Sequence, residues 1–231
     1  MSFRLHSGEI LGIAGVEGNG QTELIRLLLD PRERLESGVI KLGGRDVSRA
    51  PGGRLRLGEG LAVFPEDRLR EALLLPDSVE DNFLLGHQRA LKYRRSKLFL
   101  DRGAVRAAAE SAIRDFDVRP ANPRARAGSL SGGNQQKLVV ARELSTNPRF
   151  LLAAQPTRGV DIGAIESIHR RILDLRNKGS GVLLVSSELD EVLKLSDRVL
   201  VLYRGRVVGS FLRGDFDEKK IGLLMAGGGD K

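Results

Sequence analysis

The sequence predicts an α/β fold, in which short apolar strands alternate with amphipathic helices. An apolar run at 10–14 enters a glycine-rich loop and then a stretch with helical spacing of its leucines. Further apolar runs of strand length stand at 61–64, 150–153 and 182–185, and a hairpin is expected at 199–211. Between them, helical spacing appears at 79–85, 105–116, 138–144 and 162–175.

Composition limits the class of protein. The 231 residues are 41% hydrophobic and 29% charged, which fits a folded globular chain and not a disordered one. No apolar run reaches the length of a membrane span and the first residues show no secretory leader, so we expect a cytosolic protein. With no cysteine and three scattered histidines, disulfides, thiol catalysis and cysteine-based zinc sites are excluded.

The net charge is +8, and the basic residues concentrate between positions 87 and 106. They are Arg89, Lys92, Arg94, Arg95, Lys97, Arg102 and Arg106. Such charge attracts nucleic acid or an acidic membrane surface, although a solvated face is the commoner explanation. Only Tyr93 and Phe99 interrupt the run. This is a poor platform for stacking bases, which argues against nucleic acid as a partner.

The first glycine-rich loop, Gly15–Thr22, has the spacing of a phosphate-binding P-loop. An ordinary tight turn is the alternative, but a strand before the loop and a helix after it favour phosphate binding. The P-loop lysine is replaced by Gln21, so we expect weak nucleotide binding, with Thr22 still able to reach Mg²⁺. The candidate nucleotide-binding residues are Gly15, Gly18, Asn19, Gly20, Gln21 and Thr22.

A second loop, Ser131–Gly133, opens directly into an amphipathic helix. Two glycines let the backbone come close to another molecule, and a helix N-terminus attracts phosphate. Ser-Gly-Gly alone also fits a flexible turn before a surface helix. The whole octet at 130–137, LSGGNQQK, is more specific.

This octet resembles the signature loop of ATP-binding-cassette (ABC) ATPases, in the form seen in sugar and nucleoside importers. The resemblance covers about 8–227, with four motifs in the family's order. It implies a P-loop NTPase (RecA-like) core of ABC type, with an antiparallel β section and an inserted helical subdomain. The expected boundaries within a single domain, 1–231, are about 1–77 and 138–220 for the core and β section, 78–137 for the helical subdomain, and 221–231 for a disordered tail.

In that family the signature loop crosses a dimer interface to the γ-phosphate of ATP held by the other nucleotide-binding domain, and the D-loop crosses the same interface. The resemblance therefore implies contacts in trans from this chain. Those in the signature loop would be made by Ser131, Gly132, Gly133, Asn134 and Gln135, and those in the D-loop by Gly159 and Asp161.

The resemblance also marks positions where the family's own ATP-site residues are replaced. Ala154 and Gln155 stand where the family has a metal-binding aspartate and a catalytic glutamate. Alanine offers no oxygen, and an amide cannot take up a proton, although Gln155 could orient water. Ser187 stands at the switch histidine, and Glu66 near the glutamine that senses Mg²⁺, where a helix start is an equally good interpretation. No catalytic residue is intact.

Together, the motif variants look like the C-terminal, degenerate half of a tandem importer ATPase for nucleosides or simple sugars. The implied cofactors are ATP and Mg²⁺. The implied partners are a second, N-terminal nucleotide-binding half, membrane permease subunits and, indirectly, an extracellular solute-binding protein. The domain would lie on the inner face of the cell membrane through the permease, complete the other half's ATP site, and be weak or inactive alone.

Three alternatives remain open. A nucleotide-binding or regulatory module would never hydrolyse ATP, even with an intact second half. A DNA-associated ABC ATPase would need a long coiled coil, zinc cysteines or a complete paired set of motifs, which the sequence does not contain. An autonomous ATPase would need a compensating cation and a base, for which Glu66 and Glu188 are the candidates.

Overall fold

The computed structural model describes residues 1–29, 33, 35–48, 60–96 and 98–228. The chain divides into two compact units. The first contains Met1–Val63, Pro148–Gln155 and Ile172–Lys231, and the second contains Phe64–Asn147 and Pro156–Arg171. The helical subdomain expected at about 78–137 falls within the second unit.

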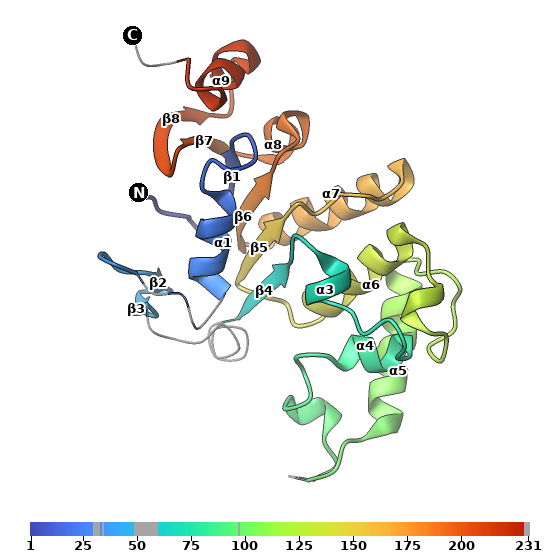
Figure 1. Ribbon diagram of the computed structural model, residues 1–231. Helices are drawn as coiled ribbons and strands as arrows, with labels where there is room; N and C mark the ends of the chain where they lie inside the picture. The colour runs from blue at the N-terminus through green and yellow to red at the C-terminus, as the bar shows by residue number, and fades with distance from the viewer. Residues whose placement is uncertain (30–32, 34, 49–59, 97, 229–231) are drawn as a thin grey trace. The chain divides into compact units, whose positions relative to one another are not determined.

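A six-stranded sheet forms the centre of the first unit, in the order β4-β5-β6-β1-β7-β8 (Figure 1). Strand β1 pairs in parallel with β6 and with β7, β5 pairs in parallel with β6, and β7 and β8 form an antiparallel hairpin. The bounds are β1 Ile10–Ala14, β4 Leu61–Phe64, β5 Phe150–Ala154, β6 Gly181–Ser186, β7 Arg198–Tyr203 and β8 Arg206–Leu212. The predicted α/β fold and its strands are confirmed.

The strand sequences follow from their places in the sheet. Every residue of β1 and β6 is buried, because parallel strands lie inside the fold, and such strands read as unbroken apolar runs. The edge strand β8 instead alternates exposed and half-buried residues. A separate short hairpin joins β2 (Lys41–Leu42) to β3 (Arg45–Asp46).

The described residues of the first unit include helices α1 (Gln21–Leu29), α8 (Leu189–Leu195) and α9 (Glu218–Met225). Helix α9 corrects the expected disordered tail over 221–225. Ile221 and Met225 are buried in a cluster with Val192, Val199 and Val201, so an apolar stripe anchors this helix. The glycines at 227–229 made the whole tail look disordered in the sequence, so the apolar stripe before them was overlooked. Positions 229–231 lie outside the described residues.

The second unit is helical, as the sequence predicts from about residue 78. It contains α3 (Arg68–Glu71), α4 (Val79–Leu84), α5 (Arg102–Asp115), α6 (Gly132–Leu144), two short 3₁₀ helices (Leu91–Tyr93 and Ala127–Ser129) and the first part of α7 (Ile162–Asn177), whose end belongs to the first unit. Its core packs Phe83, Val105, Ile113 and Leu138 together. Within the described residues, no helix is both long and apolar enough to cross a bilayer.

Candidate functional site

The P-loop of the first unit runs from the end of β1 to the start of α1. Gly18 and Gly20 have φ of +88° and +109°, a left-handed conformation that favours glycine. A Cβ at Gly20 would lie 3.0 Å from the Gly205 Cα, and one at Gly15 would lie 2.8 Å from the Leu202 carbonyl oxygen. Gly18 is therefore required for its backbone angles, Gly15 for its close approach to β7, and Gly20 for both its angles and its approach to the β7–β8 turn.

Gln21, at the lysine position, turns back into this loop. Its Nε2 donates a hydrogen bond to the Val16 carbonyl at 3.2 Å, and a Cβ placed on Gly15 would lie 2.5 Å from that same Nε2. The carboxamide therefore lies against Gly15. Because an amide is neutral, it supplies no positive charge to offset phosphate. Thr22 follows in the first turn of α1 and is half-buried.

Asn19 has a structural role in the same loop. Its side chain is 6% exposed, its Nδ2 donates to the Met225 carbonyl at 3.1 Å, and its Oδ1 accepts from the Arg204 backbone N–H at 3.2 Å. Its own carbonyl accepts from the Gly205 N–H at 2.8 Å. Asn19 thus ties the P-loop to the end of α9 and to the β7–β8 turn.

We expect Asn19→Ala to lower the free energy of unfolding by about 1–3 kcal/mol, because it leaves buried backbone groups without their partner. Urea unfolding followed by circular dichroism measures this. The control is Asn177→Ala, at an exposed position near the end of α7, which should leave the midpoint almost unchanged. Equal midpoints for the two variants would contradict the structural role of Asn19.

Two of the replaced positions lie together at the end of β5. Ala154 is buried and ends the strand, and Gln155 follows with φ of +47°. The Gln155 Oε1 accepts hydrogen bonds from the Ser187 backbone N–H and from its hydroxyl, both at 3.2 Å. Gln155 and Ser187, which stand at the family's glutamate and histidine positions, are therefore hydrogen-bonded to each other.

The signature loop of the second unit opens α6. Ser131 is exposed and caps the helix, its Oγ accepting from the Asn134 N–H at 3.4 Å and from the Asn134 Nδ2 at 2.9 Å. Gly133 and Gln135 are buried, and the Gln135 Nε2 donates inward to the Ala127 carbonyl at 3.3 Å. Ser131 and the first N–H groups of α6 are therefore the parts that a ligand could reach.

The turn at 117–119 fixes the start of α6. The Asn134 Oδ1 accepts from the Arg119 N–H at 2.7 Å, and the Lys137 Nζ donates to the Asp117 carbonyl at 3.1 Å. The hydrogen bond from the Arg119 guanidinium lowers the pKa of the exposed Asp117 carboxyl, and Lys137 adds to the effect. The Asp117 carboxyl therefore keeps its charge to lower pH than an isolated aspartate does.

The D-loop lies against the signature loop of the same chain. A Cβ on Gly132 would lie 3.0 Å from the Gly159 carbonyl oxygen, and one on Gly133 would lie 2.4 Å from the Asp161 Oδ2. The Asp161 Oδ1 accepts from the Ala164 N–H at 2.9 Å, at the start of α7. Two motifs far apart in the sequence therefore form one surface within the second unit.

Arg68 is a residue of this surface that sequence analysis missed. Its Nη1 donates to the Arg158 carbonyl at 2.7 Å and its Nη2 to the Gly159 carbonyl at 3.2 Å, so one guanidinium holds two successive D-loop carbonyls. Burial lowers the pKa of Arg68, and Asp67 opposes that effect. Glu66 forms an ion pair with Arg158 at 3.5 Å. The sequence signal for Arg68 is its position two residues after Glu66.

We expect Arg68→Ala to loosen the D-loop. Losing its hydrogen bonds should reduce local opening free energy by about 1.5–3 kcal/mol, so the hydrogen-bonded amides of Val160 and Ala164 should exchange roughly 10- to 100-fold faster. Native-state hydrogen exchange measures this. Arg70→Ala in the same helix is the control, because that side chain is 88% exposed and pairs only weakly with Asp67. Unchanged D-loop protection in Arg68→Ala would contradict the role.

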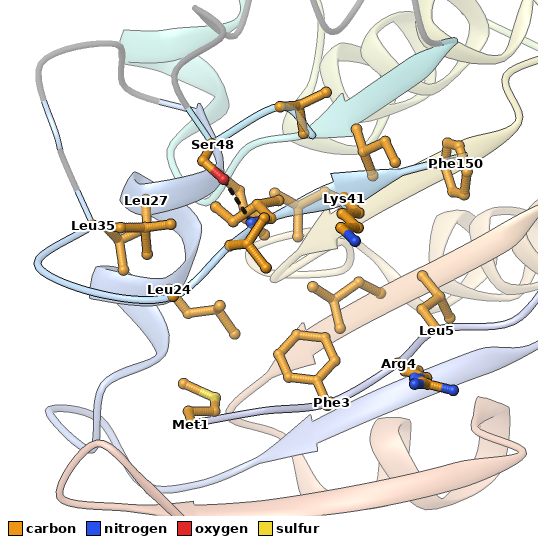
Figure 2. A pocket seen from close by; sticks show the side chains of 18 of the residues that line it. Met1, Phe3, Arg4, Leu5, Leu24, Leu27, Leu35, Lys41, Ser48 and Phe150 are labelled. Carbon is orange, nitrogen blue, oxygen red and sulfur yellow. Dashed lines mark hydrogen bonds between the residues drawn. The ribbon is translucent and has the colours of Figure 1, made fainter. Parts of the chain in front are cut away.

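The first unit also contains a cavity of about 1830 Å³ (Figure 2). Apolar side chains of Phe3, Leu5, Leu24 and Leu27 border it, and Figure 2 shows the Ser48 Oγ accepting a hydrogen bond at one side. From the P-loop segment only Gly18 and Gly20 reach its wall. Three basic residues, Arg4, Lys41 and Arg149, also border it, so the cavity combines an apolar wall with positive charge and adjoins the P-loop segment.

Comparison with known proteins decides the family. A family model described as "ABC transporter" matches residues 1–158. The chain belongs to the ABC transporter family. Its fold agrees, since a nucleotide-free ATP-binding cassette from an ABC transporter superposes with a TM-score of 0.77 at 22% identity, covering 98% of this chain and 87% of that one. The ADP conformation of another cassette, MJ1267, gives 0.74 at 22% identity, covering 98% and 87%.

Curated relatives of this ABC-family chain are named as import ATP-binding proteins. It is 47% identical to the glucose import ATP-binding protein TsgD13 of Haloferax volcanii, over 100% of this chain and 42% of the relative. It is 41% identical to the nucleoside import protein NupA of Lactococcus lactis subsp. cremoris (99% and 44%) and to the guanosine import protein NupO of Bacillus subtilis (100% and 45%). The chain spans less than half the length of these relatives.

Proposed function

We propose that this ABC-family domain is the C-terminal nucleotide-binding half of a tandem importer ATPase for sugars or nucleosides. In this proposal its signature loop and D-loop complete the ATP site of the N-terminal half, while its own site is degenerate. The observation that carries the proposal is an asymmetry. The residues of one ATP site are replaced in this chain, whereas the surface that would serve a second site is assembled.

The replaced side belongs to the first unit. Gln21 places a neutral amide where phosphate charge needs a cation, and Ala154 has no oxygen for a metal shell. Thr22 offers one hydroxyl at the start of α1. No cluster of three His, Asp or Glu side chains suited to a metal ion occurs in the described part of the chain. These residues fit Mg²⁺ poorly, so we assign no hydrolytic step to this site.

The assembled side belongs to the second unit. Ser131 presents its hydroxyl at the N-terminus of a 13-residue helix, whose first N–H groups have no partner within the helix. A helix start of this kind suits a phosphate group. Arg68 and Asp161 hold the D-loop beside it. The chain would therefore supply donors, and the other half would supply the lysine, the metal and the base.

The proposed partners follow from the relatives. Their names describe import of glucose, nucleoside and guanosine, and this chain matches less than half of each. A second nucleotide-binding half would account for much of the remaining length. In the proposal the pair works on permease subunits at the inner face of the cell membrane, with an extracellular solute-binding protein acting through the permease.

The test is ATP turnover by this domain alone and after mixing with a second half that carries the P-loop lysine and the catalytic glutamate. We expect the lone domain to be weak or silent and the mixture to hydrolyse ATP faster than the second half alone. Turnover by the lone domain would show that the replacements at Gln21, Ala154 and Gln155 are not losses. Absence of turnover in the mixture would favour a non-hydrolysing, regulatory module, which the paired Gln155 and Ser187 also fit.

A further inference from the structure

A short loop of the second unit exposes large apolar side chains. Leu91, Leu98 and Phe99 are 86%, 88% and 69% exposed, within nine positions of one another. Single exposed apolar residues are ordinary, but a group of three on one loop indicates a surface for contact. With the exposed Arg89, Lys92 and Arg95, these residues form what we call the apolar-basic tip.

The fold holds this tip in place. The Arg95 N–H donates to the Phe99 carbonyl at 3.0 Å, and the Asp101 N–H donates to the Tyr93 carbonyl at 2.9 Å. Tyr93 is buried and anchors the loop in the helical core. Leu98 and Phe99 are therefore carried outward by a hydrogen-bonded turn, which lowers the entropy that a partner would have to remove.

The charge at the tip has one sign. The sequence contains no Asp or Glu between Asp81 and Asp101. Arg102 and Arg106, which also belong to the basic run, differ because they pair with Asp81 and Glu80 on α4. The Lys92 Nζ lies 4.9 Å from the centre of the Tyr93 ring and donates to the Ser145 carbonyl at 3.5 Å. The exposed cations of the tip thus lie close in the sequence to its three exposed apolar side chains.

We propose that the apolar-basic tip binds the surface of a membrane that contains anionic phospholipids. Leu91, Leu98 and Phe99 would enter the boundary between headgroups and acyl chains, where apolar side chains gain by leaving water. Arg89, Lys92 and Arg95 would meet lipid phosphates, an attraction worth about fivefold in affinity for each cation. Nucleic acid fits less well as a partner, because the tip offers one exposed aromatic ring for base stacking, that of Phe99. Leu91 and Leu98 would stay in contact with water in such a complex.

This lipid contact is independent of the proposed transport role, since it requires neither ATP nor a permease. The test is co-sedimentation of the chain with vesicles of phosphatidylcholine alone and of phosphatidylcholine with phosphatidylglycerol. We expect binding to the anionic vesicles only, weakened at high salt. No binding to either vesicle would overturn the proposal and leave an acidic protein surface as the partner.

Two double variants separate charge from apolar contact. Arg89→Gln with Arg95→Gln should reduce vesicle affinity by roughly 25-fold, at about fivefold per cation, and Leu98→Ser with Phe99→Ser should reduce it at least as much. The matched controls lie in the first unit: Arg204→Gln with Arg206→Gln, both exposed, and Leu212→Ser with Leu223→Ser, 58% and 57% exposed. Equal losses in tip variants and controls would overturn the proposal. Thermal unfolding of every variant confirms that the fold is kept.

Discussion

Ser131→Asp is expected to lower ATP turnover by the assembled pair about 1000-fold relative to Ser131→Asn. In the proposed complex the residue at 131 faces the γ-phosphate of ATP held by the other half. A carboxylate about 4 Å from one phosphate charge is repelled by about 4 kcal/mol at an effective dielectric of 20, which corresponds to about three orders of magnitude. Asparagine has nearly the same size and carries no charge.

The comparison between Ser131→Asp and Ser131→Asn is informative because both substitutions keep the N-terminal cap of α6. Ser131 caps α6 through the Asn134 N–H, and Ser, Asp and Asn are about equally good in this position. Asp gains slightly from the helix dipole. Both variants should therefore unfold at similar temperatures, so any difference in turnover reports the phosphate contact and not folding.

A second control tests whether any negative charge added near the signature loop lowers ATP turnover. Ser129→Asp places the same carboxylate two residues upstream, at an exposed position whose hydroxyl bonds back to the Arg126 carbonyl. Its turnover with the second half should stay close to that of the unchanged domain. If Ser131→Asp is no worse than Ser131→Asn, the signature loop does not reach phosphate in trans and that part of the proposed function is wrong.

The sequence was sufficient for the strands and the motif loops, for physical reasons. Buried parallel strands such as β1 and β6 need unbroken apolar runs, and the loops at Gly15 and Ser131 have fixed spacing. Each of these signals is local. The β7–β8 hairpin was equally accessible, because two strand-like runs are separated by Gly205, whose positive φ in the structure suits the turn.

What the sequence could not predict depends on contacts between distant residues. Arg68 bonds to carbonyls about ninety positions away, and Gln155 meets Ser187 across 32 positions. Helix α9 is ordered only because Ile221 and Met225 find a buried cluster. Spacing shows which residues share one element, but it does not show which elements meet. The detailed roles of site residues therefore appear only in the folded structure.

Gly133→Ala should reduce turnover by the assembled pair about 100-fold, the scale expected from a displacement of about 1 Å in a reacting group. The added Cβ would lie 2.4 Å from the Asp161 Oδ2 and 3.2 Å from the Ala164 Cβ. Either the Asp161 carboxylate turns away, at the cost of its hydrogen bond from the Ala164 N–H, or the D-loop moves away from α6. Helix propensity acts in the opposite direction, since alanine is better than glycine in a helix by about 1 kcal/mol. Turnover should therefore fall more clearly than stability.

Gly163→Ala is the matched control, because its Cβ would lie 3.5 Å from the Asp161 Oδ1, an ordinary contact. It offers α7 the same gain in propensity and leaves the D-loop in place, so turnover should not change. The double variant Gly133→Ala with Asp161→Ala tests the cause. With the carboxylate gone, the extra methyl group should destabilise the domain no further than Asp161→Ala alone. If the two substitutions are additive in the free energy of unfolding, contact with Asp161 is not the reason that position 133 requires glycine.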